Sequence, residues 1–486
     1  MRERLQQRDG FRWIALVVLL SGIFAVGLSF TLLSVVLPDI EDEFGVSFST
    51  AQWVVTGPIL VFGVFGPVMG KLADIFGARR VYLVGFTGAA VMFLLTSFSW
   101  SFTALLVFRL VGALEGAATA PAAIKFIASI FDPEERPKAI GWESFIMAFS
   151  PAFGLLVGTA LVPVFGWRAM FFVQFLLCIV VLAAAFVILP DTERRRDVHI
   201  DYAGAVTLAL GTFSGLFALN RAEPWGFADP VVIACFVAAP VLLVAFVWIQ
   251  RRVEHPLFPL HYFRRRNVWA GLSAAGLTNF AYLGGFLLAA PLLADVLVYS
   301  EGKRLLVLGF RPFAFAVVGA IAGYVVVRVG ERRVAVFGAA GVALGMFGLG
   351  IVTGSSPLAW LLASLVVTGA GMGLATPAYA SAVVNSLDLE DQGVAGGIAA
   401  SVQAAASAAG TVVLIWVQQS ALERGASLER SFALAYLVAG IVCAGAVALA
   451  FAIRPTVGKS RRVKADAGRE RREVADAEAA FEVFED

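Results

Sequence analysis

The chain contains 486 residues, of which 59% are hydrophobic and 15% are charged. Its mean hydropathy of +0.85 lies outside the usual range of water-soluble domains, so the composition excludes an ordinary soluble protein. The 37 basic and 35 acidic residues nearly cancel, and only their distribution along the chain is informative. The three cysteines stand singly inside apolar stretches, which indicates neither a disulfide framework nor a cysteine metal site.

Fourteen apolar stretches follow one another along the chain. A helix that crosses the hydrocarbon core of a bilayer needs about 20 mainly apolar residues. The stretches are 14–37, 44–70, 81–108, 103–130, 144–167, 169–190, 202–220, 230–250, 267–294, 312–327, two within 334–387, 393–422 and 431–453. We therefore predict an all-α membrane protein with fourteen transmembrane helices.

The basic residues predict which side of the membrane each loop occupies. Lys and Arg concentrate in cytoplasmic segments. If the N-terminus is cytoplasmic, 28 of the 37 fall in the two terminal segments and alternate loops, against six in the loops of the other side. The apolar run after Arg12 is too long for a signal peptide and lacks a cleavage site, so residues 1–12 should lead into the first helix. Both termini are predicted to be cytoplasmic, in a multi-pass protein of the cell membrane.

The two halves of the chain repeat each other. Segment 70–80, GKLADIFGARR, returns as 323–333, GYVVVRVGERR, with two glycines and two arginines in register. Further along, Pro121 matches Pro377 and Gly141 matches Gly397. The stretches 202–220 and 230–250 have no counterpart, so we predict a six-helix bundle (1–190), two inserted helices with their loops (191–266), a second bundle (267–455) and a charged tail (456–486). Duplicated halves are typical of transporters whose substrate site lies between the repeats.

The repeated loop resembles the cytoplasmic motif between helices two and three of the major facilitator superfamily. Four more segments resemble its fourteen-helix drug:proton antiporter branch: 31–38 (TLLSVVLP), 52–53 (QW), 166–168 (GWR) and 255–260 (HPLFPL). The similarity covers roughly residues 11–455. It implies the major facilitator fold and proton-coupled export of small molecules.

Segment 70–80 also has a physical interpretation of its own. Asp74 should end a helix, where the helix dipole disfavours an anion, so it should seek a cation, such as Arg79 or Arg80, or the N-terminus of another helix. In the family, these residues latch the cytoplasmic ends of the two bundles in the outward-facing state. We expect this latch at Gly70, Asp74, Gly77, Arg79 and Arg80. The alternative is a solvated basic loop. In the second copy Val327 replaces the acid, so the latch should be asymmetric.

Helix four carries charges at membrane depth, which are costly and usually face a bundle interior or an aqueous cavity. Glu115 should lie near the midplane, because it is about 18 Å from the outer end of the helix. We expect it to face the cavity and to carry protons or substrate; a buried ion pair is the alternative. Arg109 lies nearer the outer face and matches a family arginine implicated in proton handling. Lys125 should form an ion pair with Glu143 of helix five.

The helix-five segment Ser150, Pro151, Gly154 and Gly158 resembles the antiporter motif of the branch in reduced form. The proline should kink the helix, and the small residues should let a neighbouring helix pack closely and slide. Ordinary helix packing in the membrane would explain the glycine spacing equally well.

Other polar residues are candidates for the substrate and proton pathway. Arg311 precedes a proline at membrane depth and could bind an anionic substrate group or pair with Asp295. Further candidates for cavity lining, each with interhelical hydrogen bonding as its alternative, are Gln174, Asn279, Gln403 and Trp416. Helix one, by contrast, lacks the acid of the drug:proton branch, since Ser29 and Ser34 occupy the corresponding positions. Glu115 is left as the main acid near the midplane.

These features favour a secondary active transporter that exports small amphipathic or apolar molecules in exchange for protons by alternating access. A proton-coupled uptake symporter, a membrane enzyme and a non-transporting sensor or scaffold are the alternatives. The chain has no phosphate-binding Walker motif, and its histidines, His199, His255 and His261, have no metal spacing. We expect no catalytic residue, cofactor, metal or nucleic acid, and a monomer whose partners are its substrate, protons and the lipid bilayer.

Overall fold

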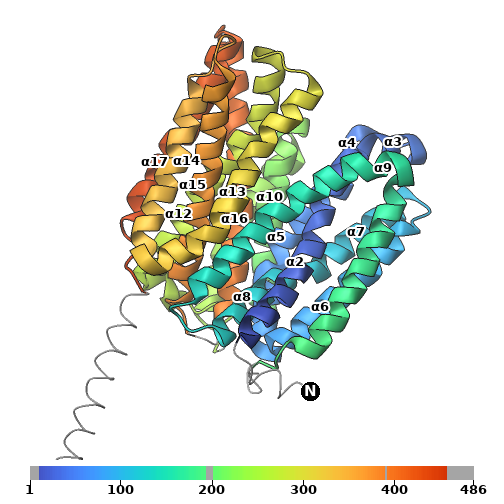
Figure 1. Cartoon of the computed structure of the whole chain (residues 1–486), viewed down its shortest axis with the longest axis vertical. Helices are drawn as coiled ribbons and strands as arrows, with labels where there is room; N and C mark the ends of the chain where they lie inside the picture. The colour runs from blue at the N-terminus through green and yellow to red at the C-terminus, as the bar shows by residue number, and fades with distance from the viewer. Residues whose placement is uncertain (1–9, 193–200, 255, 389–390, 457–486) are drawn as a thin grey trace, which may run out of the picture.

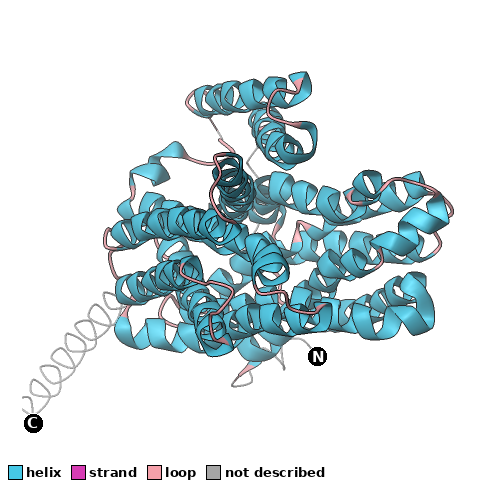
Figure 2. Ribbon diagram, turned by 90° about the horizontal axis from the view of Figure 1, so that it is seen from above, coloured by secondary structure: helices cyan, strands magenta, loops and turns pink. Residues whose placement is uncertain are grey.

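The computed structural model describes residues 10–192, 201–254, 256–388 and 391–456. Within these ranges the regular secondary structure is helical throughout (Figure 2). The predicted charged tail beyond residue 456, His255 and most of the loop 191–200, with His199, lie outside the described residues.

The helices confirm the predicted all-α architecture. They are α2 (Phe11–Val35), α3 (Leu37–Phe44), α4 (Phe48–Ala51), α5 (Trp53–Phe76), α6 (Ala78–Ser97), α7 (Phe102–Gly116), α8 (Thr119–Ile130), α9 (Arg136–Ile188), α10 (Tyr202–Trp225), α11 (Pro230–Gln250), η1 (Leu260–Arg264), α12 (Arg266–Pro291), η2 (Leu292–Val296), α13 (Glu301–Val329), α14 (Glu331–Gly350), α15 (Leu358–Val384), α16 (Gln392–Glu423) and α17 (Leu428–Ala450).

Within the described residues, thirteen helical segments are long and apolar enough to cross a membrane. One of them, α9, has 53 residues and joins two helices at Gly166, whose φ of 75° breaks the helical backbone. The described chain therefore offers fourteen membrane passes. One predicted boundary is wrong: the second pass begins at Trp53 rather than near residue 44, because the chain first forms the short helices α3 and α4.

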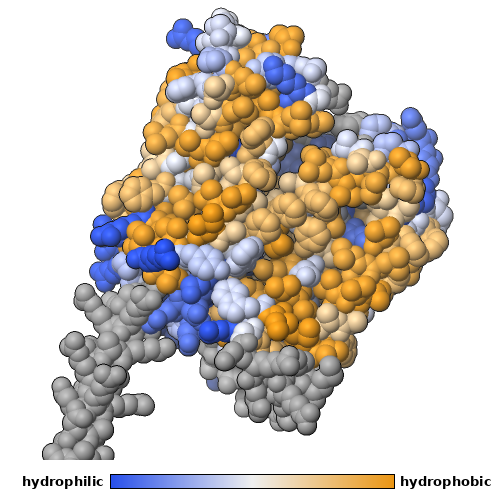
Figure 3. All heavy atoms as spheres, viewed as in Figure 1, coloured by the Kyte–Doolittle hydropathy of each residue, from blue (hydrophilic) through white to orange (hydrophobic). Residues whose placement is uncertain are grey.

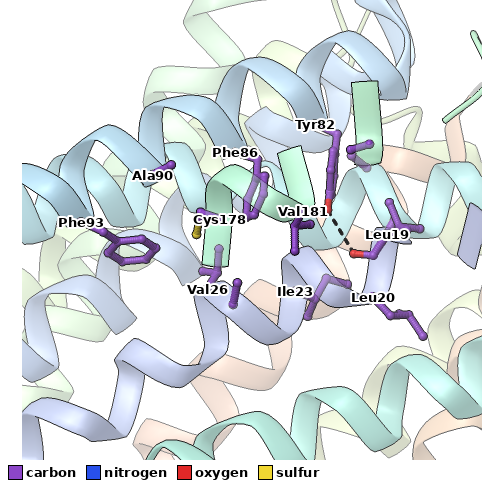
Figure 4. Packing of buried hydrophobic residues seen from close by; sticks show 14 of the residues in the cluster. Leu19, Leu20, Ile23, Val26, Tyr82, Phe86, Ala90, Phe93, Cys178 and Val181 are labelled. Atoms are coloured by element: carbon purple, nitrogen blue, oxygen red, sulfur yellow. Dashed lines mark hydrogen bonds between the residues drawn. The ribbon is translucent and has the colours of Figure 1, made fainter. Parts of the chain in front are cut away.

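The helices form two groups, each with its own core. Helices α2–α9 lie on the right in Figure 1 and α12–α17 on the left. The first core runs from Ala15 to Leu189 and the second from Ala270 to Ile453. In the first core, the Tyr82 hydroxyl on α6 donates a hydrogen bond to the Leu19 carbonyl on α2 at 3.1 Å (Figure 4). A buried hydroxyl without an acceptor would cost stability, so this bond fixes how the two helices face each other.

Helices α10 and α11 pack on each other, and α10 also contacts α5 and α16. Arg221 of α10 lies over the Trp53 ring at the start of α5, with its guanidinium carbon 3.9 Å from the ring centroid. Side chains such as Val237 and Val244 on α11 are exposed, as expected of helices that face lipid. The space-filling view shows hydrophobic residues over the middle of the molecule and hydrophilic ones toward its two ends (Figure 3).

The two ends of the described chain lie on the same side of the molecule. Near the beginning, Arg12 forms an ion pair with Glu135. Near the end, Thr456 lies 3.2 Å from the Asn385 amide nitrogen, which also donates to the Pro133 carbonyl. This is the arrangement that an even number of membrane passes requires. We call this end the predicted cytoplasmic side.

On the opposite side, the GWR segment holds the turn at Gly166. Trp167 and Arg168 both donate hydrogen bonds to the Glu43 carboxylate, at 3.2 and 2.7 Å. The hydrogen bond from Arg168 lowers the pKa of the Glu43 carboxyl, against a smaller opposing effect of burial. The short helix α3 is thereby tied to the bend in α9.

Candidate functional site

A cavity of about 460 Å³ lies between the two groups of helices. Helices α8 and α9 line it from the first group, and α12, α13, α15 and α16 line it from the second. Its wall is mainly apolar, and its polar side chains are those of Glu143, Ser144, Asn279, Tyr282, Thr376, Tyr379 and Gln403. A largely apolar cavity with a few convergent polar groups is typical of a small-molecule site.

The seven residues predicted for the substrate and proton pathway do not all reach this cavity. Asn279 and Gln403 line it. Those that do not line it are Arg109, Glu115, Gln174, Arg311 and Trp416. Trp416 is 52% exposed and does not line the cavity, so its predicted place in the cavity is wrong.

Glu115 is the most important correction. Its carboxyl group faces α6, where the position of a Cβ built on Gly88 would lie 2.2 Å from the Glu115 carboxyl carbon. One carboxyl oxygen, Oε2, is buried without a hydrogen-bond partner among the described residues. Because Gly88 has no side chain, it leaves the space that this carboxyl occupies between α6 and α7. The prediction that Glu115 faces the cavity is therefore wrong.

Arg109 and Gln174 tie helices of the first group together. Arg109 is buried and donates hydrogen bonds to the carbonyl oxygens of Val54 on α5 and Ser29 on α2, at 3.3 and 3.1 Å. Gln174 donates to the Ala25 carbonyl on α2 at 2.5 Å. Buried donors need acceptors, and the backbones of α2 and α5 supply them. Both residues hold the bundle together at positions away from the cavity wall.

Arg311 lies just behind the cavity wall. It is fully buried and donates to the Tyr282 carbonyl oxygen, with its guanidinium carbon 4.1 Å from the Tyr282 ring centroid and 5.4 Å from that of Phe286. The predicted pair with Asp295 does not form, because the Asp295 side chain is exposed at the far end of η2. The rings of Tyr282 and Phe286 thus lie between this cation and the cavity.

Asp74 joins the two groups of helices on the predicted cytoplasmic side. Its buried carboxylate accepts hydrogen bonds from the backbone N–H groups of Gly393 and Val394, at 3.1 and 2.9 Å, and lies 3.0 Å from the Lys125 ammonium. The two N–H groups belong to the first turn of α16, whose own N-cap residue, Asp391, forms no side-chain capping bond. Asp74 therefore caps a helix of the other bundle, where the helix dipole favours an anion.

The cation beside Asp74 is Lys125 and not an arginine of the loop. Arg79 instead donates to the Asp191 carboxylate and the Phe186 carbonyl, at 2.9 and 2.8 Å, within the first group. Arg80 is exposed. The predicted pairing of Lys125 with Glu143 is also wrong, since the ammonium faces Asp74.

Glycines bring the two groups into backbone contact at two equivalent places. At the α5–α16 contact, a Cβ on Gly70 would lie 2.3 Å from the Gly393 carbonyl oxygen. At the α13–α9 contact, a Cβ on Gly323 would lie 2.1 Å from the Pro137 carbonyl oxygen. The repeat read from the sequence is therefore also a repeat of contacts. Val327 leaves the second contact without a carboxylate equivalent to Asp74.

Gly77 and Gly330, the matching loop glycines, have φ angles of 88° and 92°. This left-handed region favours glycine because it has no Cβ, so both sharp helix-to-helix turns require it.

A second polar connection lies beside Asp74. Lys71 forms an ion pair with Asp391 at 3.6 Å. The Tyr262 hydroxyl of η1 donates toward both Asp391 and Asp388, at 2.9 and 2.7 Å. The bond from Tyr262 is the main cause that lowers the pKa of the Asp388 carboxyl. The segment after the inserted helices is thus tied to the loop before α16.

The helix-five motif packs against α2. The Ser150 hydroxyl donates to the Phe24 carbonyl oxygen at 2.8 Å, and a Cβ on Gly27 would lie 2.1 Å from the Ser150 oxygen. Gly154 and Gly158 are buried on the same helix. Small residues at this spacing allow the close approach of two helices.

Sequence reasoning missed the place of Glu143. The side chain is 8% exposed, lines the cavity and has no hydrogen-bond or ion-pair partner among the described residues. An available signal was its position directly before the uncharged stretch 144–167, one turn from Met147, which also lines the cavity.

Comparison with known proteins points to one family. The sequence model described as Major Facilitator Superfamily matches residues 19–411. The chain is 30% identical to the tetracenomycin C resistance and export protein of Streptomyces glaucescens over 83% of this chain and 76% of that protein. It is also 30% identical to the puromycin resistance protein pur8 of Streptomyces alboniger, over 92% of this chain and 90% of that protein.

Two solved structures share the fold. The human organic anion transporter MFSD10 (TETRAN) matches with a TM-score of 0.68 at 16% identity, over 91% of this chain and 100% of that one. The proton:xylose symporter XylE matches with a TM-score of 0.62 at 16% identity, over 90% of this chain and 95% of that one.

Proposed function

Since this chain belongs to the Major Facilitator Superfamily and is a multi-pass membrane transporter, we propose that it exports small amphipathic or apolar molecules in exchange for protons. The observation that carries the proposal is the largely apolar cavity between the two groups of helices. The names of the Streptomyces relatives, which refer to drug resistance and export, support the outward direction. The proposal assigns the chain no enzymatic activity.

We further propose that the cavity opens to alternate sides of the membrane. The contacts of Asp74, Gly70 and Gly323 join the two groups on the predicted cytoplasmic side, and the groups diverge toward the opposite end (Figure 1). Opening toward the cytoplasm would require these contacts to separate while each core stays intact. Asp74 and the glycines would then act as the latch of the closed state.

The termini are proposed to be cytoplasmic. Single cysteines at Glu254 and Ala228, both exposed, test this orientation after the native cysteines are replaced. A membrane-impermeant maleimide applied to intact cells should label position 228 and not position 254. The reverse pattern would overturn the orientation.

Transport is tested with purified protein in liposomes. Labelled puromycin or tetracenomycin C is supplied outside, and the pH gradient is imposed in either direction. An exchanger should accumulate the compound when the lumen is acidic, because protons then leave as substrate enters. An uptake symporter should accumulate it when the outside is acidic.

A protonophore and protein-free liposomes are the controls. Equal accumulation with and without either gradient would contradict proton coupling. No movement of either compound would contradict the proposed substrate class.

A further inference from the structure

Glu143 stands alone as a charged group in the cavity wall. Among the described residues that line the cavity, no other acidic or basic side chain occurs. Its carboxyl is nine-tenths buried and has no partner within the described chain. We propose that Glu143 is the recognition group of this cavity and that it binds the protonated amine of a lipophilic substrate. The proposal deepens the proposed export function, on which it rests for its biological meaning.

None of the nearby described cations lines the cavity. On α8, Lys125 is paired with Asp74. On α13, Arg311 lies behind the rings of Tyr282 and Phe286. On α9 itself, one turn or more toward the cytoplasmic end, Arg136 donates to backbone carbonyls and to Asn385, and Lys138 pairs with Glu135.

The remaining titratable groups near the cavity are tyrosines. Tyr282 of α12 and Tyr379 of α15 line it. The Tyr379 hydroxyl lies 3.1 Å from the Thr278 hydroxyl and can exchange a hydrogen bond with it. From α16 the cavity receives the neutral side chain of Gln403 and small residues. No described neighbour therefore supplies a positive charge to Glu143.

An unpaired carboxylate buried in a largely apolar wall is unfavourable when ionised, because burial removes much of the solvation of its charge. A proton neutralises it, and so does a cationic group of a ligand. A carboxyl group that holds a proton cannot form a full ion pair with a cationic ligand at the same time. Binding of an amine cation should thus displace a proton, which is the exchange that an antiporter needs.

The rest of the wall suits the body of such a ligand. Met147, Leu283, Phe315 and Met372 offer apolar contact, while Asn279 and Gln403 offer hydrogen bonds. Among the described residues of the wall, an anionic ligand would find a carboxylate and no cation. The cavity chemistry therefore selects for cationic, lipophilic molecules.

The test uses three probes with the same fluorophore and similar length. Dansylcadaverine carries a primary amine, its N-acetyl derivative is neutral, and dansyl-6-aminohexanoic acid is anionic. Equilibrium binding is measured on the full chain in lipid nanodiscs, together with proton release in weakly buffered solution. The variants are Glu143→Gln, Glu143→Asp and, as the matched control, Glu115→Gln, which removes a carboxyl that does not line the cavity.

The wild type should bind the amine about tenfold or more tightly than the neutral probe, with proton release. Glu143→Gln should erase this preference and the proton release, while the neutral probe shows that the cavity is intact. Glu143→Asp and Glu115→Gln should keep both.

A wild type without preference for the amine, or a Glu143→Gln variant that retains it, would overturn the proposal. If Glu143→Gln binds none of the probes, the Glu143→Asp variant decides. Loss of the preference for the amine probe in Glu143→Asp would count against the proposal, and retention of that preference would support it. If the amine preference holds but no gradient drives transport, the proposed export function fails and the binding site stands.

Discussion

The contact between Asp74 and the start of α16 makes a quantitative prediction for the two conformations of the transporter. Of the three partners of this carboxylate, Lys125 belongs to α8 of the same group, so that ion pair should persist when the groups separate. The N–H groups of Gly393 and Val394 belong to the other group. Of the contacts made by Asp74, only the bonds to these two N–H groups should therefore bias the equilibrium between the closed and open states.

Two substitutions of Asp74 should weaken its bonds to the start of α16 to different extents. Asp74→Asn keeps an acceptor that can cap a helix but removes the charge, at a cost to the closed state of about 1.4 kcal/mol, or about tenfold. Asp74→Ala removes both bonds, at a cost of about 3 kcal/mol, or on the order of a hundredfold. Both substitutions should shift the population toward the cytoplasm-open state, and Asp74→Ala should do so more strongly.

The assay is the distance distribution between spin labels at positions 80 and 333, two exposed and pseudo-equivalent sites on the two groups. Asp191→Asn is the matched control, because its ion pair with Arg79 lies on the same side but within one group. The longer-distance population should grow from wild type to Asn to Ala and stay unchanged in the control. Identical distributions in the wild type and both Asp74 variants would refute the capping argument.

Three further predictions follow from the geometry. Gly323→Ala should shift the same spin-label distances toward the open state, because its Cβ would meet the facing backbone, whereas Gly309→Ala on the same helix enters open space and should not. Glu115→Gln should retain gradient-driven accumulation in liposomes, since the Glu115 carboxyl does not line the cavity. Loss of accumulation would show that proton coupling depends on Glu115. Arg168→Gln should lower the free energy of unfolding by no more than about 1 kcal/mol at neutral pH. Because Arg168 lowers the folded-state pKa of Glu43 below its usual 4.5, melting curves of the variant and wild type should converge as the pH falls below that value.

The number of helices and the repeat could be predicted because they are properties of whole segments. Apolar length is set by the thickness of the bilayer. The repeated glycines could be found because a contact such as that of Gly70 with Gly393 tolerates no side chain. The need of Asp74 for a cation or a helix N-terminus also followed from its position at a helix end.

The direction in which each polar residue points could not be predicted in the same way. Rotation of a membrane helix about its axis depends on its packing against neighbours. Glu115 and Glu143 are both single acids in apolar helices, yet Gly88 makes room for one between α6 and α7, and the other reaches the cavity. The partner of Lys125 also depends on which face of α8 carries this residue. From sequence spacing alone we expected Glu143, whereas the Lys125 ammonium lies beside Asp74.

The latch and the cavity are built on the same helices, and this links the two proposals. Ile124 of α8 lines the cavity and directly precedes Lys125, the partner of Asp74. On α16, Gly396 packs against Ile124 and lies one turn from Gly393, which Asp74 caps. A displacement of α16 from α8 must therefore change the cavity wall and the capping bonds together. Occupancy of the cavity can bias the latch only through its differential affinity for the two arrangements, and the shared helices provide the contacts that would differ.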